Sequence, residues 1–127
     1  MARIRVQFKD GGFVTIQLRP ESTPTIEALL TAVPFSSNAN TWGDEVYFNA
    51  PFHAELETDA RAEMEIGDVA FWPDGDAIAI FFGRTPASVN DKPRAYSPCN
   101  LIGTLEGDIS ALKRVKSGYS LEIAHAR

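Results

Sequence analysis

Two neighbouring apolar runs near the middle of the chain constrain its fold more than any other feature of the sequence. Residues 69–72 and 77–82 flank Pro73-Asp74-Gly75-Asp76, a segment typical of a turn, so together they predict a β-hairpin. Nearly every position of both runs is apolar, whereas a strand with one solvated face alternates apolar and polar residues. The hairpin must therefore be covered on both faces, by a barrel with something packed against its outside or by a lined groove.

Shorter strands are predicted on both sides of this hairpin. Residues 4–8 and 13–18 alternate apolar and polar side chains around Asp10-Gly11-Gly12, which predicts another hairpin. Residues 45–48, 101–105 and 119–123 predict single strands, whereas the Ser- and Asn-rich segment 35–42 and the Pro-containing segment 84–98 predict loops.

Two helices are predicted between the strands. Thr23 is suited to cap a helix over residues 24–33, in which Ile26, Leu29, Leu30 and Val33 form one apolar stripe, and we expect Leu29 and Leu30 to be buried. Asp108 is suited to cap a second helix over residues 109–115. Many short strands and two helices predict a mainly β fold, a barrel with a helix at each open end.

Length and charge exclude several classes of protein. At 127 residues the chain fits a single domain, residues 1–127, with one core. The formal net charge of −5, with only Lys113, Arg114 and Lys116 clustered, argues against nucleic acid as a partner. No apolar run approaches the ~20 residues of a membrane span, and no signal peptide is evident. We therefore expect a cytoplasmic protein without a membrane partner, and the oligomeric state stays open.

The sequence offers little for a metal or a cofactor. With His53 and His125 as its two histidines and no C-x-x-C pair, the chain lacks the ligands of a zinc site, and its carboxylates are not spaced as in a calcium loop. No glycine-rich phosphate motif occurs, so no cofactor is expected. Cys99 is interpreted as a buried structural residue, because nothing in the sequence brings a histidine base to it.

Four motifs occur in order along nearly the whole chain: Trp42-Gly43-Asp44-Glu45-Val46-Tyr47-Phe48, Gly67-Asp68-Val69-Ala70-Phe71-Trp72-Pro73, Ile80-Phe81-Phe82-Gly83 with Thr85-Pro86, and Ile102-Gly103 before Gly107-Asp108. In this order they resemble a family of small, uncharacterised prokaryotic cyclophilin-like proteins. The resemblance implies the cyclophilin fold, a closed antiparallel β-barrel of about eight strands with two capping helices. Phe81-Phe82 also resembles the paired phenylalanines of true cyclophilins, whose second ring floors the proline pocket, so Phe82 is carried over as a groove residue.

The sequence departs from true cyclophilins where catalysis is concerned. Their activity is attributed to an arginine on the strand that matches residues 45–48, and this strand contains no arginine. Ile80 replaces a groove glutamine, and Trp72 stands where a small alanine flanks the pocket. Arg84, directly after Phe81-Phe82-Gly83, is the one candidate for a relocated donor. The resemblance thus implies the fold more strongly than prolyl isomerase activity.

The aromatic residues are the remaining functional signal. Tyr47, Trp72 and Phe82 are candidates for the walls of a ligand groove, with Glu45 on the side of Tyr47 and Arg84 at its edge, whereas Phe71 and Phe81 are assigned to the core. The leading interpretation is a protein that binds a small molecule or a peptide segment in this groove and lacks efficient prolyl isomerase activity. One alternative is a divergent peptidyl-prolyl cis-trans isomerase. Another is a structural protein whose apolar face is closed by Trp72 or by the segment 84–98.

Overall fold

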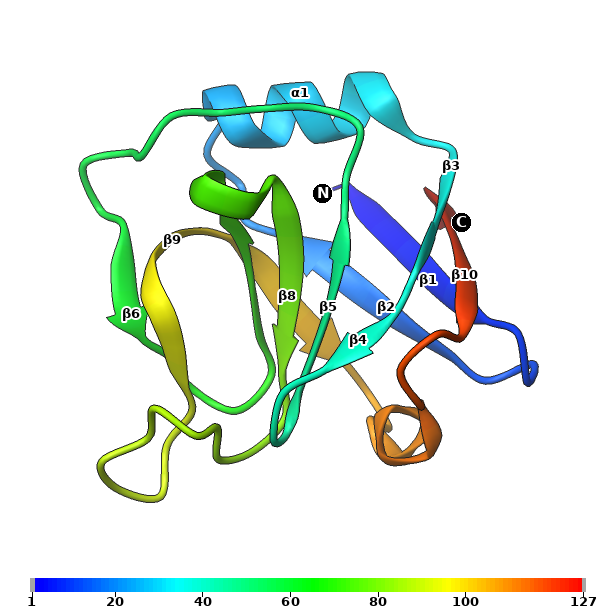
Figure 1. Cartoon of the computed structure of the whole chain (residues 1–127). Coiled ribbons are helices and arrows are strands. Elements are labelled where there is room, and N and C mark those ends of the chain that lie inside the picture. Colours follow the sequence, from blue (N-terminus) through cyan, green and yellow to red (C-terminus); the bar gives the residue numbers. More distant parts are fainter. Residues whose placement is uncertain (1, 127) are drawn as a thin grey trace.

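The computed structural model describes residues 2–126 and shows a mainly β protein with one α-helix and two short 3-10 helices (Figure 1). All strand pairs are antiparallel, and the sheet has the order β3-β10-β1-β2-β9-β7-β8-β5-β4, with β6 paired to β9. The strands are β1 (Arg3–Phe8), β2 (Phe13–Leu18), β3 (Phe35–Asn38), β4 (Asn40–Thr41), β5 (Glu45–Asn49), β6 (Arg61–Glu63), β7 (Asp68–Trp72), β8 (Ala77–Phe81), β9 (Arg94–Glu106) and β10 (Ser120–His125).

The hydrogen-bonded sheet is not closed, so the predicted closed barrel is wrong. Its path ends at β3 and β4, which pair with β10 and β5 and not with each other. Only Ala39 separates these two strands, and its backbone bonds Tyr119 and Gly118 ahead of β10. The two end strands of the sheet are therefore joined through the covalent chain at Ala39 and not by hydrogen bonds between them. Both strands lie in segment 35–42, which was predicted as a loop from its Ser and Asn residues. They are strands because they pair with β10 and β5 at the ends of the sheet.

The central hairpin is confirmed, and it is buried on both faces. On one face Val69 and Phe71 of β7 and Ile78 and Ile80 of β8 belong to the main core. On the other face Ala70, Ala79, Phe81 and partly buried Trp72 belong to a second, smaller apolar cluster. Because side chains alternate along a strand, the two sets are interleaved in the sequence.

Helix α1 (Pro24–Ala32) is confirmed and covers one end of the sheet, at the top of Figure 1. The Thr23 hydroxyl oxygen accepts from the amide of Ile26 at 3.2 Å, as a helix cap does. Leu29 is fully buried, whereas Leu30, which we expected to be buried, is only partly so. None of the helices described within residues 2–126 has the length and apolarity to cross a membrane.

The second predicted helix is a 3-10 helix, η2 (Ser110–Arg114), so residues 2–126 contain one α-helix where two were predicted. It lies at the end of the sheet opposite α1 (orange in Figure 1). Its N-cap is Ile109, and Asp108, which was predicted as the cap, accepts a hydrogen bond from the Ser110 amide at 2.9 Å. Five residues close too few i to i+4 hydrogen bonds to sustain an α-helix, and the tighter turn is used in such short pieces.

Strand β9 is much longer than predicted, because it begins at Arg94 within the segment interpreted as a loop. Its register against β7 shifts between Val69 and Ala70, at a bulge. The part of β9 after the bulge pairs with β2 and with the start of β7, and the part before it pairs with β6 and with the end of β7. The bulge bends the strand and lets one segment serve both halves of the sheet.

We predict that Leu29→Ala lowers the free energy of unfolding by ~2–5 kcal/mol, because it leaves a cavity under α1. Leu30→Ala, a matched change one residue away, removes a half-buried side chain and is expected to cost clearly less. Urea denaturation of both variants measures the difference. Equal losses would contradict this account of how α1 packs.

Candidate functional site

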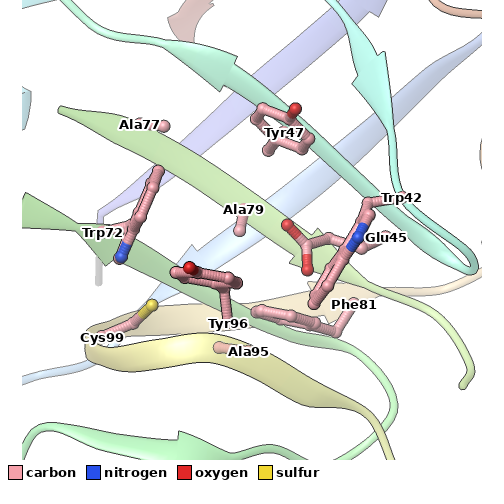
Figure 2. A pocket seen from close by; sticks show the side chains of 10 residues that line it. All are labelled: Trp42, Glu45, Tyr47, Trp72, Ala77, Ala79, Phe81, Ala95, Tyr96 and Cys99. Atoms are coloured by element: carbon pink, nitrogen blue, oxygen red, sulfur yellow. The ribbon is translucent and has the colours of Figure 1, made fainter. Parts of the chain in front are cut away.

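A cavity of about 190 Å³ opens on the face of the central hairpin that points away from the main core (Figure 2). Strands β5, β7, β8 and β9 and the turn before β5 contribute its lining. The lining is mostly aromatic and small apolar, and it comprises Trp42, Glu45, Tyr47, Trp72, Ala77, Ala79, Phe81, Ala95, Tyr96 and Cys99.

The cavity exists because small residues face it from the middle of the sheet. In the register of β5, β7 and β8, Ala79 lies opposite Tyr47 and Ala77 lies opposite Trp72. Ala95 of β9 is also buried against this face. Larger side chains at these positions would fill the space that the surrounding rings enclose.

Three aromatic rings stand as walls around this floor. The Tyr96 ring lies nearly perpendicular to both tryptophans, at 6.3 Å and 68° from Trp42 and 5.9 Å and 76° from Trp72. The indole N–H of Trp72 donates to the Ser97 hydroxyl at 2.6 Å. A Cβ at Gly75 would lie 2.4 Å from the Trp72 ring, so only glycine lets the ring pack against the turn. Trp72 is thus held as a wall.

Glu45 is the acidic residue of this lining, and only 7% of its surface is exposed. Its Oε1 has no hydrogen-bond partner among residues 2–126. Burial raises the pKa of the Glu45 carboxyl to about 8, because the ionised form loses its hydration and gains no counter-charge. An unpaired, protonated carboxyl inside an aromatic cavity is the most unusual chemical feature of the described residues.

Cys99 borders the same cavity but is not activated as a nucleophile. Burial, with smaller effects of Glu45 and Asp74, raises the pKa of its thiol to about 12, and Sγ donates to the Ser97 carbonyl. His53 instead bonds the carboxylates of Asp76 and Glu55. Within residues 2–126, no three or more His, Cys, Asp or Glu side chains are grouped as metal ligands.

The structure brings together three of the five residues predicted for the groove: Glu45, Tyr47 and Trp72. Phe82 packs against the main core, and the exposed Arg84 does not line the cavity. The place of Phe82 follows from alternation, since it continues the series Ile78, Ile80 just past the end of β8, whereas Arg84 lies in the loop beyond. Phe81, which we assigned to the core, is buried and also lines the cavity, in register with Glu45.

Sequence reasoning missed further lining residues, of which Trp42 and Tyr96 are the largest. Tyr96 was missed because residues 84–98 were predicted to form a loop, whereas strand β9 begins at Arg94. Trp42 lies in the turn between β4 and β5, where no periodicity reports its direction. The spacing of Ala77 and Ala79 with Phe81 was the available signal, because it marks one face of β8 as unusually small.

Comparison with known proteins agrees with this architecture. The model of the family described as cyclophilin-like matches residues 2–124. The chain belongs to the cyclophilin-like family. It is also similar to the solution structure of a hypothetical protein from Archaeoglobus fulgidus, with 38% sequence identity, a TM-score of 0.84, and coverage of 98% of this chain and 95% of that chain. No curated protein matches the chain. Family membership therefore gives this cyclophilin-like protein its fold and leaves its activity to be argued from the cavity.

We predict that the stability of this cyclophilin-like protein falls between about pH 4.5 and pH 8 because of Glu45. In this window the folded carboxyl keeps a proton that the unfolded chain has lost, since folding raises its pKa from 4.5 to about 8. Glu45→Gln stays neutral at every pH. Relative to this variant, the wild type is expected to lose ~2–4 kcal/mol of unfolding free energy between pH 5 and pH 8.5. Parallel pH curves from urea denaturation would mean that folded Glu45 is ionised.

Proposed function

We propose that this chain is a binding protein whose site is the aromatic cavity, that it takes a small molecule or a single side chain of a peptide segment, and that it lacks efficient prolyl isomerase activity. The observation that carries the proposal is the unpartnered Glu45 oxygen inside the cavity. A buried polar group without a partner costs ~1–3 kcal/mol, and a ligand that bonds it removes this cost. The site therefore favours an occupant with a complementary polar group.

The size and composition of the cavity support a small occupant. Its volume of about 190 Å³ lies below the ~300–1,000 Å³ of sites for drug-sized ligands. Aromatic walls with a small number of polar groups are the usual composition of such sites, where the rings supply contact area and the polar groups fix orientation. From the segment 84–98, only Ala95 and Tyr96 line the cavity, and both belong to strand β9. None of the residues 84–93 lines it, which weighs against a face closed by a loop.

The charges around the cavity argue against efficient isomerisation. Rotation about a prolyl bond has a barrier of ~18–20 kcal/mol, and an isomerase lowers it by donating a hydrogen bond to the prolyl nitrogen from a fixed group. Among the described residues, the lining includes no Lys or Arg. The indole N–H of Trp72 is already used by Ser97, and the side chain of Arg84 is exposed. The absence of a cationic donor from the described lining supports the proposal that the protein lacks efficient isomerase activity.

We predict that a cavity-filling variant loses ligands that the wild type binds. The probes are choline, its neutral isostere 3,3-dimethylbutan-1-ol, and N-acetyl-proline methylamide, and binding is read from tryptophan fluorescence, since both tryptophans of the chain line the cavity. Ala79→Leu places a larger side chain on the cavity floor and is expected to reduce the affinity for any bound probe at least about tenfold. Two-dimensional NMR of the indole N–H groups locates the binding.

Ala124→Leu is the matched control, because it makes the same change at an exposed position of β10. It is expected to leave binding unchanged. If no probe perturbs the indole signals, or if Ala79→Leu binds as the wild type does, the cavity is not a binding site and the proposed function fails.

We predict that this protein isomerises an Ala–Pro tetrapeptide at least about a hundredfold more slowly than an ordinary cyclophilin, because removing one preorganised donor commonly costs ~10²–10³ in rate. The cis-to-trans rate is the measurement. Trp72→Ala enlarges the cavity without adding a donor, so it is expected to create little turnover. Brisk turnover by the wild type that Arg84→Ala abolishes would instead establish the divergent isomerase, with Arg84 as a relocated donor.

A further inference from the structure

The rings of the cavity are arranged as a cage. Trp42 and Trp72 both stand steeply against Tyr96, at interplanar angles of 68° and 76°, so the three rings form adjoining walls. Tyr47 adds a further ring from β5. Figure 2 shows the Glu45 carboxyl pointing into the space that these rings surround. The faces of aromatic rings carry a negative quadrupole, so the cage and its acid together present a site for positive charge.

Nothing of the described chain supplies that positive charge. The cavity lining contains no Lys, Arg or His from residues 2–126. Burial raises the pKa of Glu45, and no nearby cation lowers it again. The protein carries a formal net charge of −5, which raises the local concentration of small cations around it. A buried carboxylate is stable only when it is paired, and the described lining of the cavity supplies no cation to pair with Glu45.

Resting on the proposed binding function, we infer that the ligand of this cavity is a small methylated ammonium group, held by the faces of Trp42, Trp72 and Tyr96 and paired with the Glu45 carboxylate. Methyl groups spread the charge and reduce the hydration that the ligand must lose, so such a cation suits apolar walls better than a bare ammonium. The volume of about 190 Å³ suits a headgroup rather than a larger molecule.

Binding of the cation is coupled to loss of a proton. In the free protein the pKa of Glu45 is about 8, so near pH 7 the carboxyl is mostly protonated. The cation selects the ionised form, and the proton leaves to solvent when the pair forms. The other titratable groups that face this space are Tyr47 of β5 and Tyr96 and Cys99 of β9, with Asp74 of the β7–β8 turn near enough to act on Cys99. The Cys99 thiol, whose pKa is about 12, stays protonated up to pH 9.

The decisive experiment compares choline with 3,3-dimethylbutan-1-ol, which has the same shape without the charge, by calorimetry at pH 7 and pH 9. Choline is expected to bind at least about tenfold more tightly than the isostere at pH 9. Its dissociation constant is expected to fall about tenfold from pH 7 to pH 9, as the ionised fraction of Glu45 rises from about one tenth to about nine tenths. Buffers of different ionisation enthalpy measure the released proton directly.

Two variants separate the parts of the cage. Glu45→Gln keeps the shape and is expected to reduce the preference for choline to the part that the rings supply and to remove the pH dependence. Tyr96→Leu changes a residue that is 77% exposed, so it leaves the fold intact, and it is expected to weaken choline by a larger factor than the neutral isostere, because both lose a contact and choline alone loses the attraction to the ring face. A peptide with trimethyllysine, set against the same peptide with lysine, distinguishes a protein side chain from a free cation as the source of the headgroup.

The outcomes are distinct. Equal or tighter binding of the neutral isostere, with affinity that falls as pH rises, overturns the cation inference while the proposed binding function stands, because a protonated Glu45 would then be the donor. Binding of choline that Glu45→Gln leaves unchanged also overturns it. Absence of choline binding overturns it as well. Failure of all probes, including N-acetyl-proline methylamide, to perturb the cavity overturns the proposed function together with the inference.

Discussion

The burial of both faces of the β7–β8 hairpin is the constraint on which the rest of the structure depends. Val69, Phe71, Ile78 and Ile80 face the main core, and the intervening positions face the second cluster. The main core holds α1, the terminal strands and this hairpin together, so the sheet gains its stability on that side. The opposite face is less densely filled, because its alanines leave a cavity there.

Glu45 lies on the cavity side of the sheet, and its burial there costs free energy because the carboxylate loses its hydration. A single strand, β5, sends Val46 and Phe48 into the main core and Glu45 and Tyr47 toward the cavity. The carboxyl has lost its water and has no partner on Oε1, so its pKa is raised to about 8. Buried polar groups without a partner are rare in native proteins, so this one calls for an explanation. The fixed Trp72, held by Ser97 and Gly75, keeps the cavity open around it.

Sequence reasoning located the elements with strong local patterns. The hairpin, α1 with its Thr23 cap, and the alternating terminal strands were predicted because periodicity and turn chemistry act over a few residues. Segments without such patterns were misread. Ser- and Asn-rich β3 and β4 are strands because β10 and β5 pair with them, and the first part of β9 is a strand because β6 and β7 flank it. The prediction that Glu45, Tyr47 and Trp72 share one surface agrees with their place in the cavity lining, because they alternate with clear core residues.

By itself the sequence determined that both faces of the central hairpin are apolar and that aromatic residues are concentrated near it, since these are properties of composition and period. Only the tertiary structure decided which face is core and which is cavity. That choice depends on register: Phe81, and not Phe82, lies opposite Glu45, and a shift of one residue exchanges the two faces. The cage also required Tyr96, which strand β9 brings to Trp42 and Trp72 from far along the chain. Long-range pairing, which no local pattern encodes, therefore assembled the site.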